Sequence, residues 1–222
     1  MVLDPKWKDF FESHWNSGKW MRPDVALSQL RNNPDSFLRK YPILNTFDCS
    51  ISGPTQAHFA NYTDIKGGLR PGSVLGTKRM HKTQGFRVQN KQFRNGEGFA
   101  FNVQGVFTRQ SSGAMLWRVL DNTGPDIMLT AKLTGCTFAV KPGDRPGELR
   151  VIHLQPNQET GLDLNRRMKA VNAVETYGRL NYNYKSRTVN IIGVRSKGTW
   201  QIFAQKLDKH RMAIRSLRKL SP

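Results

Sequence analysis

The spacing of apolar residues predicts helices in the first part of the chain. Four aromatic residues recur at i, i+3, i+4 and i+8 and so share one helical face: Trp7, Phe10, Phe11 and Trp15. Asp4 followed by Pro5 suits the start of this helix, because an acidic cap and a first-turn proline are favoured there. Pro23 and Pro34, each followed by aspartate, indicate two further short helices, so we expect a helical N-terminal segment over 1–45.

After a loop-rich stretch over 46–96, the pattern changes at Gly98 to the alternation typical of strands. We expect strands at 99–103, 106–107, 115–120, 126–133, 136–141, 148–154, 189–194 and 199–204. Between them, Asp163 caps a predicted helix that runs to about Tyr177. These elements predict a strand-rich body over 98–206.

Helical spacing returns in the last segment of the chain. Phe203, Leu207, Ile214 and Leu217 fall on one stripe, and the opposite face is strongly basic. We therefore predict a basic C-terminal helix over 203–220. Its stripe is expected to pack on the core, and its basic face is a candidate contact for membrane or nucleic acid.

The order of these elements defines a fold class. Helices come first and a strand-rich body follows, which favours α+β over a regular alternation of strands and helices. A chain of 222 residues suits one compact domain. We predict a single α+β domain over 1–222, with packed mixed or antiparallel β-sheets in a β-sandwich-like core, flanked by helices.

Charge narrows the classes of partner. The formal net charge is +19, which favours an acidic partner such as nucleic acid, an anionic membrane or an acidic protein surface.

No apolar run approaches the roughly 20 residues that span a bilayer. The N-terminus lacks the pattern of a Sec signal peptide, so we expect any export to use another route. We expect a monomer.

Motifs for common cofactors and metals do not occur in the chain. It has no GxxxxGK[ST] loop, no CxxC and no HExxH, and its five histidines lack metal-ligand spacing. We therefore expect no cofactor and no metal. The two cysteines, Cys49 and Cys136, are expected to be reduced, with Cys49 structural.

A nearly symmetric turn, KPGDRPGE, predicts a hairpin over 129–156. If Asp144 and Arg145 are the centre of the turn, residues whose numbers sum to 289 lie opposite each other. Cys136 then faces His153. Phe138, Val140, Leu149 and Val151 form one apolar face that continues to this pair.

This register suggests thiol chemistry. An imidazole opposite a cysteine can take its proton and stabilise a thiolate–imidazolium pair. Gly135 leaves room for a carbonyl, and backbone N–H groups around Gly135 and Cys136 are candidate donors to an oxyanion, with Thr134 beside them. The alternative is an inert buried cysteine that faces a histidine by chance.

The residues Leu133-Thr134-Gly135-Cys136, with His153 downstream and Thr130 six residues upstream, resemble the LxGC signature of a glutamine-deamidase superfamily. Its members include the catalytic domain of cytotoxic necrotizing factor, Burkholderia lethal factor and the chemotaxis receptor deamidase CheD. The resemblance covers 130–156 and not the rest of the chain. Chain length is similar to that of Burkholderia lethal factor.

The resemblance implies a bacterial toxin or effector that is secreted without a Sec signal and acts in the host cytosol. Cys136 would be the nucleophile, His153 the acid and base, and Thr130 a residue that orients His153. The partner would be a host protein with an accessible glutamine, of the GTPase or translation-initiation-helicase type. The positive charge suits an acidic or RNA-associated surface on that protein.

A second class of function stays open. A basic nucleic-acid-binding protein could carry the same hairpin with an inert Cys136 and His153. Its best support is the mixture of aromatic and basic residues over 78–109, which includes the run with Lys78, Arg79 and Lys82.

Overall fold

The structure is a computed structural model that describes residues 20–48, 50–62, 84–93, 98–113, 115–170, 175–183, 185–208 and 213–221. The predicted first helix, which begins at Asp4 and carries Trp7 to Trp15, lies outside these residues, as do Cys49 and the basic run at 78–82. The described helices are α2 (Pro23–Asn32), α3 (Pro34–Lys40) and α4 (Gly161–Lys169). Within these ranges, no helix combines the length and apolar character needed to cross a membrane.

The larger of two sheets has eight strands and curls into a half-barrel. Its order is β1 (Ile43–Asn45), β3 (Gly85–Gln89), β2 (Gly53–Tyr62), β4 (Phe99–Val106), β7 (Ile127–Thr130), β11 (Arg187–Ser196), β12 (Thr199–Asp208) and β13 (Ile214–Lys219). The sheet is mixed, because β1 pairs with β3 and β4 with β7 in parallel. All its other pairings in the described residues are antiparallel.

The smaller sheet carries the predicted hairpin. Its order is β10 (Glu175–Tyr177), β8 (Thr137–Pro142), β9 (Leu149–Gln155) and β5 (Thr108–Gln110), and β6 (Arg118–Leu120) also pairs with β9. The strands β8 and β9 are antiparallel, whereas β5 runs parallel to β9. The strand that carries His153 is therefore an inner strand of this sheet.

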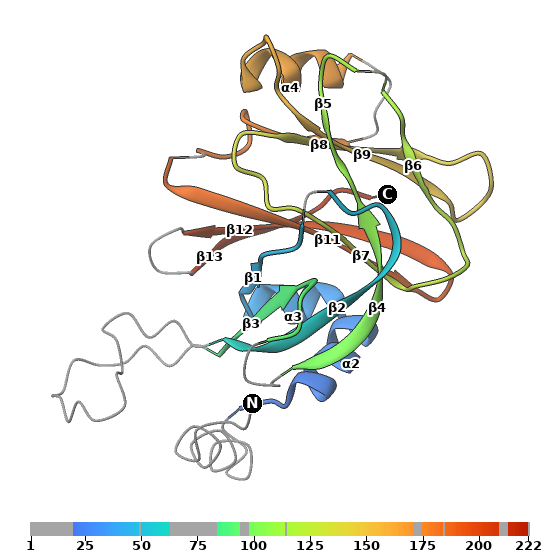
Figure 1. Cartoon of the computed structure of the whole chain (residues 1–222), viewed down its shortest axis with the longest axis vertical. Helices are drawn as coiled ribbons and strands as arrows, with labels where there is room; N and C mark the ends of the chain where they lie inside the picture. The colour runs from blue at the N-terminus through green and yellow to red at the C-terminus, as the bar shows by residue number, and fades with distance from the viewer. Residues whose placement is uncertain are drawn as a thin grey trace, which may run out of the picture.

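Helices and sheets stack in layers (Figure 1), with α4 over the outer face of β8 and β9, and α2 and α3 on the far side of the larger sheet. The core between the two sheets includes Met128, Cys136, Phe138, Val151 and Trp200. A second core packs α2 and α3 against the half-barrel, and a third packs α4 on the smaller sheet. The predicted α+β class, with mixed sheets flanked by helices, is confirmed.

Two predicted boundaries at the front of the chain are wrong. The helical segment over 1–45 contains α2 and α3, but 43–45 is strand β1. The stretch 46–96, predicted to be mostly loop, contains β2 and β3. In β2, Ala57 and Phe59 are buried while Gln56 and His58, which precede each of them, are more exposed. Pro54 lies near the start of the strand, where proline is tolerated.

The helix predicted from Asp163 to Tyr177 ends early. α4 stops at Lys169, and Glu175–Tyr177 forms β10, which pairs with Val140 to Phe138 of β8. Tyr177 is buried in the core between the sheets. Packing of this tyrosine on the sheet outweighs local helical spacing.

The predicted basic helix over 203–220 is wrong, because 203–208 belong to β12 and 214–219 form β13. Both faces of β12 are covered by packed layers: Ile202 and Ala204 belong to the core between the sheets, and Phe203 to the core under α2 and α3. A strand buried on both faces shows no alternation, and its apolar residues can match helical spacing by coincidence. β13 is an edge strand with exposed basic residues, which disfavour pairing with another chain.

The predicted hairpin exists, but its register is wrong by two residues. Phe138 lies opposite His153 and Val140 opposite Val151, so paired residue numbers sum to 291. The turn sets this register, because the N–H of Gly143 donates to the carbonyl of Glu148 at 2.9 Å. A shift of two keeps every side chain on its predicted face, and Phe138, Val140, Leu149 and Val151 do share one core with Cys136.

Candidate active site

His153 is held at the junction of the two sheets. It lies on β9 and is fully buried. Its Nδ1 is 2.6 Å from Thr130 Oγ1 at the end of β7, and 3.1 Å from Thr108 Oγ1 on β5. Thr108 lies directly opposite His153 in the parallel β5–β9 pair. The structure therefore brings Thr130 and His153, two of the predicted site residues, into direct contact.

The hydrogen bonds of Thr130 determine which ring nitrogen of His153 carries the proton. Thr130 has one hydroxyl proton, and it donates to the carbonyl of Val106 at 2.7 Å. Its oxygen must then accept from Nδ1–H of His153. The neutral ring consequently has its lone pair on Nε2. That atom is buried and has no hydrogen-bond partner among the described residues.

Burial also sets the charge of His153. Removal from water penalises the imidazolium and lowers the pKa of His153 from its ordinary 6.5 to about 3. At neutral pH the side chain is neutral and can accept a proton at Nε2. This state differs from the resting thiolate–imidazolium pair that the sequence suggests.

We expect the free energy of unfolding to fall when the pH is lowered from 7 to 5. The unfolded chain takes up a proton on His153 near pH 6.5, whereas the folded chain does not until about pH 3, so stability present above pH 6.5 is lost on acidification. The contribution of His153 over this interval is about 2 kcal/mol. Urea unfolding at both pH values, on the wild type and on His153→Asn, measures it. An equal loss in the two proteins would contradict the assignment.

Cys136 lies at the start of β8, on the face that points between the sheets. It is a buried thiol with 8% of its surface exposed. Thr134 is exposed and Gly135 is half-buried, so the thiol lies just below the surface. The observed β8–β9 pairs begin at Thr137 opposite Leu154 and place Phe138 opposite His153, so Cys136 does not face His153 as predicted. The ring of Phe138, opposite His153, lies 6.3 Å from the imidazole between centroids.

Gly135 provides space beside the thiol. Its φ is +138°, and a Cβ placed on it would find no heavy atom within 4 Å. A larger residue would be strained at this φ. Open space therefore lies next to the residue that precedes Cys136.

Tyr182, which sequence reasoning missed, controls the backbone around Cys136. Its hydroxyl accepts from the N–H of Gly135 at 2.9 Å and donates to the carbonyl of Cys136 at 3.0 Å. The Tyr182 side chain is buried and stacks on Tyr177 with ring centroids 6.1 Å apart. The Gly135 N–H, a predicted oxyanion donor, is thus engaged, and it could serve an oxyanion only by exchanging partners.

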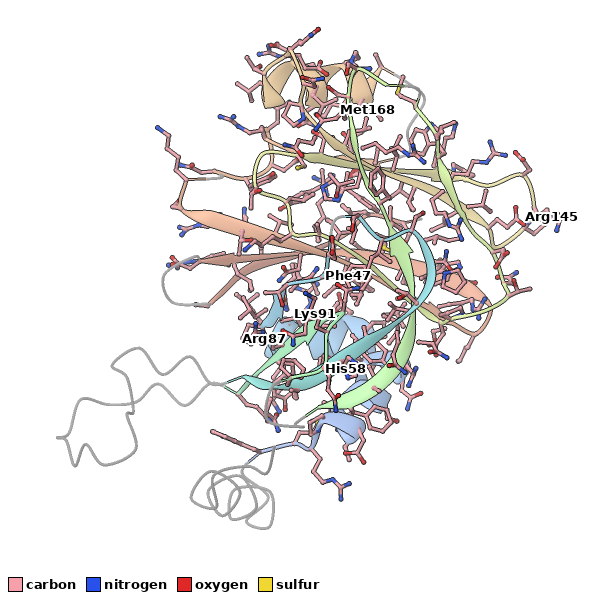
Figure 2. All side chains as sticks on the ribbon, in the orientation of Figure 1. Phe47, His58, Arg87, Lys91, Arg145 and Met168 are labelled. Atoms are coloured by element: carbon pink, nitrogen blue, oxygen red, sulfur yellow. The ribbon has the colours of Figure 1, made fainter. Side chains whose placement is uncertain are left out.

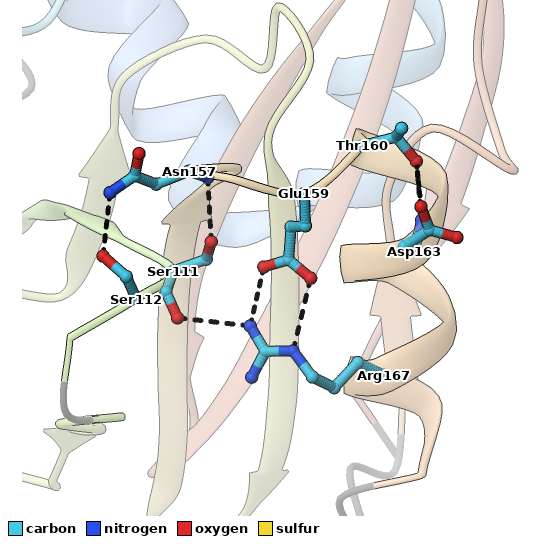
Figure 3. A network of polar contacts seen from close by, with 7 residues as sticks. All are labelled: Ser111, Ser112, Asn157, Glu159, Thr160, Asp163 and Arg167. Carbon is cyan, nitrogen blue, oxygen red and sulfur yellow. Dashed lines mark hydrogen bonds and ion pairs between the residues drawn. The ribbon is translucent and has the colours of Figure 1, made fainter.

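A polar network anchors the chain that leaves β9 after His153 (Figure 3). Arg167 of α4 binds Glu159 at 2.8 Å and the carbonyl of Ser111 at 3.2 Å, and Asn157 is held by Ser111 and Ser112. The hydrogen bond from Arg167 lowers the pKa of Glu159. The first residue of α4 also lies close to the Cys136 loop, since a Cβ at Gly161 would lie 2.7 Å from the carbonyl oxygen of Gly135.

Comparison with known proteins assigns the chain to no family. No protein-family model matches the chain, and no curated protein sequence matches it. Among the residues that the structure describes, no group of three or more His, Cys, Asp or Glu side chains could hold a metal ion.

Proposed function

We propose that this protein is a cysteine-dependent protein glutamine deamidase, in which Cys136 is the nucleophile, His153 the general base and acid, and Thr130 the residue that orients His153. The observation that carries the proposal is the contact of 2.6 Å between Thr130 and His153. It leaves Nε2 with its lone pair and with no hydrogen-bond partner among the described residues, on the buried face that also holds Cys136.

The chemistry follows from these groups. Nε2 of His153 takes the thiol proton as the sulfur attacks the carbon of a glutamine carboxamide, and the negative charge moves to the carboxamide oxygen. The imidazolium then gives its proton to the nitrogen, which leaves as ammonia, and a thioester to Cys136 remains. Water, deprotonated by the same Nε2, attacks the thioester, and the thiol is restored as the glutamate product departs.

The low pKa of His153 shapes the first step. Because the buried imidazole resists protonation, the proton transfer is coupled to the attack on the carboxamide and does not precede it. Negative charge then develops on the substrate oxygen while positive charge develops on His153. Donors that stabilise the oxyanion contribute most at this point, and the Gly135 N–H, released by Tyr182, is one candidate.

A lysate experiment tests the proposal. Host-cell lysate is treated with wild-type protein and with Cys136→Ser, and peptides are compared by mass spectrometry. We expect a glutamine-to-glutamate change at one or a few sites, present only with the wild type. Identical peptide maps would contradict the proposal. Salt-sensitive binding to nucleic acid that persists in Cys136→Ser would favour the alternative class of a basic nucleic-acid-binding protein.

Replacement of Thr130 tests the orienting role. Thr130→Val keeps the shape of the side chain but removes the nearer of the two hydroxyl oxygens around Nδ1 of His153, and leaves only Thr108 Oγ1 at 3.1 Å. We expect ammonia release from a glutamine substrate to slow by about 10- to 100-fold, the loss that follows removal of an orienting partner from metal-binding histidines.

The matched control is Thr130→Ser, which retains the hydroxyl and should restore most of the rate. The rate at which iodoacetamide alkylates Cys136 should also fall in Thr130→Val, with a changed pH profile. A Thr130→Val protein with wild-type rate and profile would remove Thr130 from the site.

A further inference from the structure

A hollow of about 570 Å³ opens beside the Cys136 loop. It lies at one end of the sheets, where β11 begins at Arg187 and β12 approaches its last residue beyond Lys206. The turn between β8 and β9 lies at the opposite end, since a Cβ on Gly147 would be 3.1 Å from the carbonyl oxygen of Gly198 in the β11–β12 turn. Cys136, at the start of β8, is therefore on the same end as the hollow.

The wall of the hollow and the Cys136 loop share side chains. Tyr182 lines the hollow and holds both the Gly135 N–H and the Cys136 carbonyl. Arg179 lines it as well, and a Cβ on Gly161 would meet Arg179 Cγ at 2.5 Å and the carbonyl oxygen of Gly135 at 2.7 Å. A polypeptide in the hollow would lie next to the open space at Gly135.

The hollow is positively charged. Arg179, Arg187 and Lys206 line it, and no carboxylate is among the described residues that do. Arg187 is offset by Asp208, whose Oδ2 is 2.7 Å away. Lys206 is held over the hollow by the Asn181 carbonyl, 3.4 Å from its Nζ. Arg179 and Lys206 add two further positive side chains to the wall of the hollow.

We propose that this hollow binds an acidic segment of the protein substrate that flanks the target glutamine; the inference rests on the proposed deamidase function. Carboxylates of the segment would pair with Arg179 and Lys206. Leu162 and Leu180 add apolar surface, and Leu180 is 47% exposed. A protein segment fits better than nucleic acid, because the one aromatic residue lining the hollow among the described residues, Tyr182, is buried and offers no face to a base.

Two fluorescent peptides test this inference. One has a single glutamine flanked by aspartates, and the other has the aspartates replaced by serines. Binding is measured by anisotropy with Cys136→Ala, so that no turnover occurs. We expect the acidic peptide to bind about tenfold more tightly or better, and salt to remove this preference. Equal affinities for the two peptides would be enough to overturn the inference, before any residue of the hollow is substituted.

Charge removal assigns the binding to the hollow. In the Cys136→Ala background, Arg179→Ala with Lys206→Ala should reduce affinity for the acidic peptide about tenfold or more and leave the serine peptide unaffected. The control, Lys91→Ala with Arg145→Ala, removes the same charge from exposed residues and should change neither. Figure 2 shows Arg145 on the outer turn between β8 and β9. Equal losses in the two double variants would overturn the inference.

Ammonia release by the chain with Cys136 intact separates this inference from the proposed function. Release from both peptides at equal rates would support the deamidase and overturn acidic docking. Preferential binding of the acidic peptide without ammonia from any glutamine substrate would support docking and contradict the deamidase. A single-stranded RNA that binds more tightly than the acidic peptide, and loses affinity in the Arg179→Ala, Lys206→Ala variant, would assign the hollow to nucleic acid.

Discussion

Cys136→Ser is expected to reduce ammonia release from a glutamine substrate by at least about 1,000-fold, the scale of loss when a covalent nucleophile is removed. A serine hydroxyl is a far weaker acid than a thiol, and the buried neutral His153 is a weak base. The pair could then no longer generate the attacking anion. Oxygen in place of sulfur changes the volume little, so thermal unfolding should stay close to that of the wild type.

The other cysteine supplies the matched control. Cys49→Ser should retain the full rate, since Cys49 is expected to be structural. Intact-protein mass spectrometry of a reaction stopped with acid should capture the acyl-enzyme on wild type and on Cys49→Ser, but not on Cys136→Ser. A Cys136→Ser protein that deamidates at more than a few per cent of the wild-type rate would refute the nucleophile assignment.

His153→Asn is expected to lower the same rate by about 100- to 10,000-fold, the usual range for loss of a general acid–base group. Asparagine can place an N–H close to the position of Nδ1, and so can keep the bond to Thr130 Oγ1. It has no equivalent of Nε2, the nitrogen that we assign as the base. The substitution therefore removes Nε2, the proposed base, and keeps an N–H donor near the position of Nδ1.

Alkylation of Cys136 distinguishes a catalytic loss from a folding defect. In the wild type, iodoacetamide should modify Cys136 near neutral pH with help from Nε2, whereas His153→Asn and His153→Ala should require a higher pH. Tryptophan fluorescence should remain native in His153→Asn. Trp200 packs with Cys136 and Phe138 in the core between the sheets, so a folding defect in this core would change the signal. Unchanged alkylation rates across the pH range would contradict a base at position 153.

The face of each hairpin residue could be predicted from the sequence, but the register could not. Side chains alternate with a period of two, so Phe138 and Val151 reach the core in either register. The register depends on which residues close the turn, and the bond between Gly143 and Glu148 is not apparent from a symmetric run of prolines and glycines. The sequence pattern also could not predict strand β12, because Phe203 and Ala204 lie on opposite faces that are both buried, and no alternation of apolar and polar residues results.

The candidate site was only partly predictable, for a topological reason. Thr130 was found through its resemblance to a motif, and its contact with His153 agrees with the role which that resemblance implies. Thr108 reaches His153 because β5 pairs in parallel with β9, and Tyr182 reaches the Cys136 loop from a loop 46 residues away in sequence. Neither residue carries a local signal, since a threonine or tyrosine in a polar stretch is common.

The contact between Thr130 and His153 joins one strand of each sheet. The side chain of His153 is therefore oriented, shielded from water and neutral only while β7 and β9 remain packed together. If the sheets separated even briefly, the imidazole would gain water and recover its ordinary affinity for protons. The oriented, neutral imidazole with its lone pair on Nε2 is thus a property of the packed sheets rather than of the hairpin alone, and a partly unfolded chain would carry Cys136 without this partner.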